Sequence, residues 1–100
     1  MIRVQLPVHL RNLAGTGKIV EIDVASPVTP ERIVDVLETS YPALRGGIRD
    51  RATRKRRPMV RYFACEEDYS HQDPGTELPE AVVTGREPFI ILGAISGGAG

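Results

Sequence analysis

The first ten residues alternate between apolar and polar side chains, with apolar residues at positions 2, 4, 6, 8 and 10. This period of two is typical of a strand with one buried face, so we expect a strand over residues 2–10. His9 would lie on its polar face, and no second His or Cys follows at a spacing that favours metal binding. Alternation returns at Val20, Ile22 and Val24. The pattern predicts a hairpin whose long connection could include some helix.

A helix start follows the hairpin. Thr29 can cap the helix with its hydroxyl, and Pro30 suits the first helical position because its missing N–H needs no partner there. The apolar positions that follow share one side at helical spacing: Ile33, Val34, Leu37 and Tyr41. Charged residues, Glu38 among them, lie off this stripe. We expect a helix over residues 30–40 that packs its apolar side on a sheet.

Residues 43–58, here named the basic loop, carry the strongest local charge in the chain. One acid, Asp50, stands against seven bases: Arg45, Arg49, Arg51, Arg54, Lys55, Arg56 and Arg57. Three interpretations remain open: a solvated loop, a docking patch for an acidic protein surface, and a nucleic-acid contact. No aromatic residues are interleaved for base stacking, which weighs against nucleic acid.

The second half of the chain predicts two more strands. Aromatic and β-branched residues over 59–65 favour a strand, and residues 66–68 form a polar turn. Residues 78–83 have the composition of a short irregular or strand-like piece. The apolar run that includes Phe89–Leu92 predicts a central strand buried on both faces. It passes into the small residues of Gly97-Gly98-Ala99-Gly100, which bury too little to stabilise the fold.

Composition limits the class of protein. One hundred residues that are 41% hydrophobic suit a single domain, and 13 basic and 13 acidic residues cancel. The molecule as a whole therefore has no charge bias toward nucleic acid or membrane. The single cysteine, Cys65, cannot form an internal disulfide, and we expect it to be structural. With no signal peptide and no apolar stretch of membrane-spanning length, we expect a soluble cytoplasmic protein.

The order of elements is strand, strand, helix, strand and strand. This order predicts an α+β fold of the β-grasp (ubiquitin-like) type, a mixed four- to five-stranded sheet with one main helix on one face. The last strand would lie beside the first and parallel to it. We expect a β-grasp domain over residues 1–96 and a flexible tail over residues 97–100. No nucleophile is paired with a base and no glycine loop precedes a helix to hold phosphate, so we expect no enzyme, no metal and no bound cofactor.

Four segments in this order resemble the ThiS/MoaD family of ubiquitin-like sulfur carriers. They are residues 10–15 after the first strand, 37–42 at the helix end, 62–68 at the strand and turn, and 90–98 at the closing strand and diglycine. The resemblance implies that the terminal glycine, Gly98 by position, is adenylated by an ATP-dependent, ubiquitin-activating-type enzyme. A sulfur donor would then convert it to a thiocarboxylate for biosynthesis of a cofactor, amino acid or other sulfur-containing metabolite. Gly97, without a Cβ, would allow close approach to the nucleotide.

The resemblance also implies partners: the activating enzyme, the sulfur donor and a sulfur-acceptor enzyme. In relatives the exposed sheet face near the tail contacts these enzymes. We expect docking through these arginines: Arg61, Arg86, Arg54, Arg56 and Arg57.

The chain departs from the family at its end, because Ala99 and Gly100 follow the diglycine. Gly98 then has a peptide bond where a free carboxylate is required. Some members of the family are made with a short extension that a zinc-dependent JAMM-type protease removes, and Ala99-Gly100 resembles such an extension. The alternatives are a non-carrier β-grasp interaction module, a ubiquitin-like protein modifier, and a nucleic-acid-binding domain that uses residues 45–57.

Overall fold

The computed structural model describes residues 1–93, which form five strands and four helical segments. In chain order they are β1 (Ile2–Gln5), α1 (Val8–Ala14), β2 (Ile19–Ile22), α2 (Pro30–Ser40), the 3₁₀ helix η1 (Pro42–Leu44), β3 (Val60–Ala64), β4 (Glu67–Asp68), α3 (Glu80–Val83) and β5 (Phe89–Gly93). None of the helices in this part of the chain is long and apolar enough to cross a membrane. The predicted tail, with Gly97 to Gly100, lies outside the described residues.

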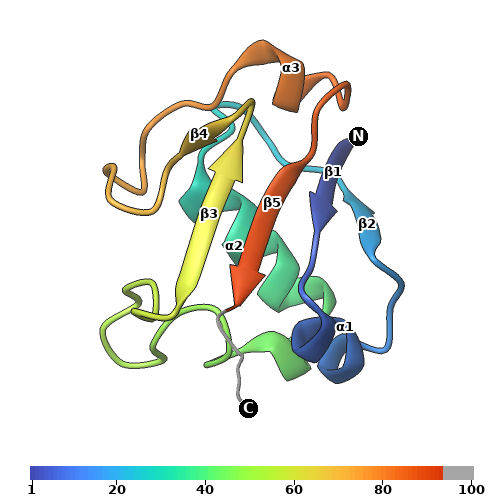
Figure 1. Cartoon of the computed structure of the whole chain (residues 1–100), viewed down its shortest axis with the longest axis vertical. Helices are drawn as coiled ribbons and strands as arrows, with labels where there is room; N and C mark the ends of the chain where they lie inside the picture. The colour runs from blue at the N-terminus through green and yellow to red at the C-terminus, as the bar shows by residue number, and fades with distance from the viewer. Residues whose placement is uncertain (94–100) are drawn as a thin grey trace.

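The strands form one mixed sheet in the order β2-β1-β5-β3-β4. β5 lies at its centre, parallel to β1 with Val4 opposite Phe89, and antiparallel to β3 with Val60 opposite Gly93. α2 crosses behind the sheet and covers one face (Figure 1). The predicted β-grasp arrangement is confirmed, including the parallel pairing of the first and last strands.

The helix α2 forms as predicted, from Pro30 to Ser40. The backbone N–H of Arg32 donates to Oγ1 of Thr29 at 3.1 Å, which satisfies one of the free donors at the helix start. Ile33, Val34 and Leu37 are fully buried against the sheet. This apolar side is what holds an eleven-residue helix that would be marginal alone.

The first strand is shorter than predicted. It ends at Gln5, and Val8, His9 and Leu10 belong to α1 instead. The reason is Pro7, which has no N–H to extend the ladder and whose carbonyl accepts the N–H groups of Leu10 and Arg11 at 3.1 and 3.0 Å. The alternation across residues 6–10 is compatible with a strand or a helix. Leu6 and Leu10 are four residues apart, so they can also lie on one side of a helix.

The prediction for residues 78–83 was also wrong, because this segment contains the short helix α3. Pro79 precedes the helix, and Glu80 lies in its first turn. Val82 is fully buried while Val83 is exposed. A four-residue helix is too short to show a period, which explains why the sequence pattern was ambiguous.

The closing strand is buried on one face only, which corrects the expectation that both faces would be covered. Phe89 and Ile91 are fully buried, Ile90 is half-buried, and Leu92 is 42% exposed. The continuous apolar run therefore has two uses. One set of side chains fills the core, and the other lies on a face of the sheet that no helix covers.

Candidate functional site

The end of β5 is where the described chain meets the predicted reactive terminus. Gly93 is the last residue of the strand, and it lies at the end of the sheet where α1 and the basic loop are found (Figure 1). The predicted site residues Gly97 and Gly98, and the predicted extension Ala99-Gly100, lie beyond the described part. The assignment of these four residues stays a prediction, and the structure describes the chain that precedes them only as far as Gly93.

His9 lies directly against Gly93. A Cβ added to Gly93 would lie 2.2 Å from Cε1 of His9, far closer than atoms can approach. The absence of a side chain at position 93 therefore allows the imidazole to pack over the strand end. His9 was predicted on the polar face of a strand, but it projects from α1 because Pro7 ends the strand earlier. No spacing rule could have connected residues 9 and 93.

A shallow hollow of about 250 Å³ opens beside this contact. It is lined by His9, Gly47, Arg57, Pro58, Met59, Val60 and Gly93. Met59 is 63% exposed, so an apolar and flexible side chain lies at the rim. One imidazole, one guanidinium and an exposed thioether thus surround the last described residue. Side chains of this kind can contact both a backbone and a partner surface.

The uncovered face of the sheet, here named the open face, extends from this hollow across the strands. Its side chains alternate with those of the core: Arg3, Gln5, Ile19, Glu21, Arg61, Phe63, Ile90 and Leu92. Ile90 is opposite Gln5 on one side and Phe63 on the other. Ile19 and Leu92 are 38% and 42% exposed. The open face therefore carries apolar side chains interrupted by arginines, a composition that suits a protein contact.

Arg61 lies on the open face directly opposite Leu92 in the β3–β5 ladder. Its Nη1 is 3.4 Å from Oδ2 of Asp68, and both side chains are well exposed. Hydrogen bonds from Ser70 lower the pKa of Asp68, with Arg61 adding a smaller effect. An exposed pair of this kind is weak, so Arg61 is available to a partner at small cost.

Arg86 occupies the opposite end of the sheet from Gly93, just before β5 begins. Its Nε lies 3.3 Å from Oγ1 of Thr84, and its carbonyl accepts from Nη2 of Arg3 at 2.9 Å. The structure thus separates two arginines that were predicted to dock together. Arg61 adjoins the end of β5, whereas Arg86 adjoins its start.

The basic loop is not simply a solvated segment, because Leu44 and Ile48 are fully buried. Arg56 donates to the carbonyls of Ser70 and Val60 at 2.9 and 2.6 Å, and to that of Arg57 at 3.0 Å. Three carbonyl partners make Arg56 a brace between the loop and β3. Docking through Arg56 stays a prediction, and any such contact would compete with this role.

Arg54 and Arg57 are more exposed but also make bonds within the domain. Nη2 of Arg54 lies 2.8 Å from Oδ1 of Asp35 on α2. Nε of Arg57 donates to the carbonyl of Gly46, and its side chain reaches the hollow at the end of β5. Of the three loop arginines predicted for docking, Arg57 is therefore the one placed beside the chain end.

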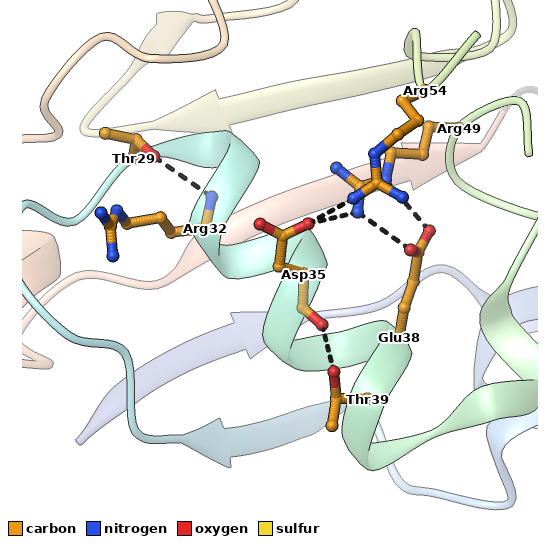
Figure 2. Close-up of polar contacts among 7 residues, drawn as sticks. All are labelled: Thr29, Arg32, Asp35, Glu38, Thr39, Arg49 and Arg54. Carbon is orange, nitrogen blue, oxygen red and sulfur yellow. Dashed lines mark hydrogen bonds and ion pairs between the residues drawn. The ribbon is translucent and has the colours of Figure 1, made fainter. Parts of the chain in front are cut away.

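Nothing in the local sequence distinguishes Arg49 from the other bases of the loop, yet it is only 5% exposed. Its Nε and Nη2 donate to the two carboxylate oxygens of Glu38 at 3.2 and 2.9 Å, and Nη2 also contacts Asp35 (Figure 2). Burial disfavours the charged form, but the hydrogen bonds that Arg49 donates to Glu38 and Asp35 leave its pKa raised. The only signal was a pair of acids three apart on α2, beside an arginine-rich loop.

Among residues 1–93, no group of three His, Cys, Asp or Glu side chains is close enough to hold a metal ion. Cys65 is exposed at the β3–β4 turn, where it adopts φ 51°. This exposure does not fit the structural role expected of the thiol.

Solved structures share this fold over almost the whole chain. SAMP1 from Haloferax volcanii matches with a TM-score of 0.75 at 20% identity, covering 96% of this chain and 97% of SAMP1. A chain of the Amycolatopsis orientalis BexX/CysO complex matches with a TM-score of 0.74 at 22% identity, covering 98% and 100%. A structure of H. volcanii small archaeal modifier protein 1 matches with a TM-score of 0.70 at 17% identity, covering 89% and 91%. No protein-family model and no curated protein matches the sequence.

Proposed function

We propose that this protein is a cytoplasmic ubiquitin-like sulfur carrier, a co-substrate of other enzymes. In this proposal Ala99-Gly100 is removed by a JAMM-type zinc protease, and the exposed carboxylate of Gly98 is the reacting group. The ThiS/MoaD resemblance and the fold shared with SAMP1 and CysO support it. In this proposal the carrier itself uses no bound cofactor, and ATP is a substrate of the partner activating enzyme.

The observation that carries the proposal is the placement of β5. The strand is paired on both sides, with β1 and β3, and ends at Gly93. Three residues separate Gly93 from Gly97 in the chain. A segment that leaves the centre of a stable sheet starts from a fixed position. The diglycine can then be presented to a narrow active site while the domain keeps its fold.

The proposed chemistry has two steps at Gly98. A carboxylate oxygen bonds to the α-phosphorus of ATP, pyrophosphate leaves, and the glycyl carbonyl is joined to AMP. A sulfide-equivalent sulfur from the donor then bonds to the carbonyl carbon, and AMP leaves with the bridging oxygen. The product is a thiocarboxylate that a biosynthetic acceptor enzyme can use. In this proposal both steps use catalytic groups of the partner enzymes.

The open face suits the partner contact that this chemistry requires. Leu92 and Arg61 are neighbours on it, and Leu92 directly precedes Gly93. A partner that covered this face would bury exposed apolar surface and gain a charged contact close to the chain end.

The experiment is intact-mass analysis of the protein isolated from its native cell. The proposal expects a species that ends at Gly98 and a second species in which one oxygen is replaced by sulfur. Incubation with the activating enzyme and ATP should convert the Gly98-ended form and leave the Gly100-ended form unchanged. A native population that ends only at Gly100, with no sulfur-bearing species, would contradict it.

A second candidate is a ubiquitin-like protein modifier, favoured by the fold shared with small archaeal modifier protein 1. It uses the same activated Gly98, but the acyl group passes to a lysine amine of a target protein. Mass spectrometry of tryptic peptides separates the two functions. A carrier leaves a thiocarboxylate on this chain, whereas a modifier leaves residues 87–98, the fragment after the last tryptic site at Arg86, on the lysine of another protein.

A further inference from the structure

A second hollow, of about 490 Å³, lies between α2 and the basic loop. It is separate from the open face, because α2 lies on the other side of the sheet (Figure 1). Four of its lining residues are arginines: Arg45, Arg49, Arg51 and Arg54. We name it the arginine pocket, and its volume is within the usual range of small-molecule sites.

The acids that line the arginine pocket already have partners. Glu38 accepts from Arg49 through both oxygens, and Asp35 pairs with Arg49 and Arg54. Asp50 accepts from the backbone N–H groups of two residues in its own turn, at 2.8 and 2.9 Å. These contacts orient the three carboxylates, and with four arginines the lining keeps a formal charge of 4 − 3 = +1.

Arg45 and Arg51 have no such partner. Within residues 1–93 neither guanidinium makes a side-chain hydrogen bond or an ion pair, yet both line the pocket. Arg51 lies across Gly46, whose missing Cβ would be 3.3 Å from Nε of Arg51. Gly46 has φ +82°, so glycine both permits the turn and leaves room for the side chain.

Arg49 also lines the pocket, and its ion pairs hold its guanidinium in one orientation. Figure 2 shows its guanidinium held over α2 by Glu38 and Asp35, with Arg54 beside it. Its Nη1 donates to no acceptor among the described residues. A buried cation held in one orientation loses little entropy when an anion binds beside it.

We propose that the arginine pocket binds a compact small molecule that carries two or more phosphate groups. Planar guanidinium groups match the geometry of phosphate oxygens, and several can share one phosphate chain. The lining includes no aromatic residue, so the pocket would recognise the phosphates and not stack on a base. A hollow of about 490 Å³ suits a compact polyanion, whereas most of an extended acidic peptide would lie outside it. This site extends beyond the proposed carrier function.

The test is a titration of the isotopically labelled full chain with inorganic tripolyphosphate, followed by NMR at constant ionic strength. Saturable shifts are expected at the backbone amides of residues 45–54 and 35–39. The double variant R45Q/R51Q should weaken binding about tenfold or more, since two charge-assisted contacts are lost. The matched control R32Q/R86Q removes the same charge elsewhere and should change the affinity less than about twofold.

Three outcomes would overturn the proposal. The first is a shift pattern spread over all basic residues without saturation, and the second is an equal loss of affinity in R32Q/R86Q. The third is tighter binding of a hexaglutamate peptide than of tripolyphosphate in the same pocket, which would indicate a protein partner. Deleting residues 97–100 should abolish carrier activity and leave tripolyphosphate binding unchanged. Failure of the carrier function and failure of the pocket are therefore separate results.

Discussion

Arg49 and Glu38 form a two-point ion pair beneath the basic loop, with Nε···Oε2 and Nη2···Oε1 distances of 3.2 and 2.9 Å. Both residues are buried, at 5% and 9% exposure. The pair joins the basic loop to α2, and both of its residues line the arginine pocket. Its consequences for stability can be measured directly.

Replacing Glu38 with Ala should destabilise the fold by about 3 kcal/mol, because a buried guanidinium loses its main partner. The double variant E38L/R49M should cost less than E38A, since no buried charge remains. Urea unfolding of the three proteins gives the comparison. E31A, which removes an exposed glutamate from the same helix, is the control and should cost well under 1 kcal/mol. Equal losses in E38A and E31A would show that the pair contributes nothing to stability.

Replacing Gly93 with Ala should disturb His9, because the new Cβ would occupy the position of the imidazole. We expect a cost of about 1 kcal/mol as the side chain moves away. In the double variant H9A/G93A most of this cost should disappear, since the clash has no second partner. Chemical denaturation measures the energies, and the imidazole proton resonances report the displacement. If H9A/G93A is destabilised relative to H9A as much as G93A is relative to wild type, the strain lies in the backbone of β5 and not in a clash with His9.

Replacing Leu92 with Asp should weaken binding to the activating enzyme at least tenfold while changing stability little. Leu92 is 42% exposed on the open face, beside Arg61 and next to Gly93. Val83, which is 39% exposed on α3 at the other end of the sheet, provides the matched control V83D. Calorimetric titration of the two variants against the enzyme is the measurement. Equal losses in both would exclude the open face as the specific contact.

Tyr62 should make stability fall at high pH. Its side chain is 6% exposed, and this burial raises its pKa to about 12 from the ordinary 10.0, with nearby Arg49 and Arg56 acting in the opposite direction. Above pH 10 the unfolded tyrosine loses its proton before the folded one. A stabilisation that is fully present below pH 10 is therefore lost as pH rises toward 12, to the extent of about 2 to 3 kcal/mol.

Urea unfolding of wild type and Y62F between pH 9 and pH 12 isolates this effect. The difference in unfolding free energy between the two proteins should change with pH only above about pH 10. Among the described residues the Tyr62 hydroxyl makes no hydrogen bond, so Y62F should fold normally. A pH-independent difference would show that the phenol titrates alike in both states.

Local signals in the sequence determined much of the fold. Thr29, Pro30 and the apolar spacing after them set α2 from end to end, because capping and periodicity act within a few residues. β3 and β5 followed from apolar and β-branched runs, and the order of elements indicated a β-grasp sheet. The helix at residues 8–14 was anticipated only as some helix in the connection after residue 10, because alternation through Pro7 resembled a continued strand.

Contacts between distant residues were decided by the tertiary structure alone. The pairing of Arg49 with Glu38, the packing of His9 on Gly93 and the division of β5 into a core face and an open face depend on how the sheet and α2 meet. The seven bases of the basic loop lie in similar local sequence. Arg56 nevertheless bonds to backbone carbonyls within the domain, whereas Arg45 and Arg51 line a hollow. Local physics selects helices and strands, but only packing assigns a charged side chain to a partner or to solvent.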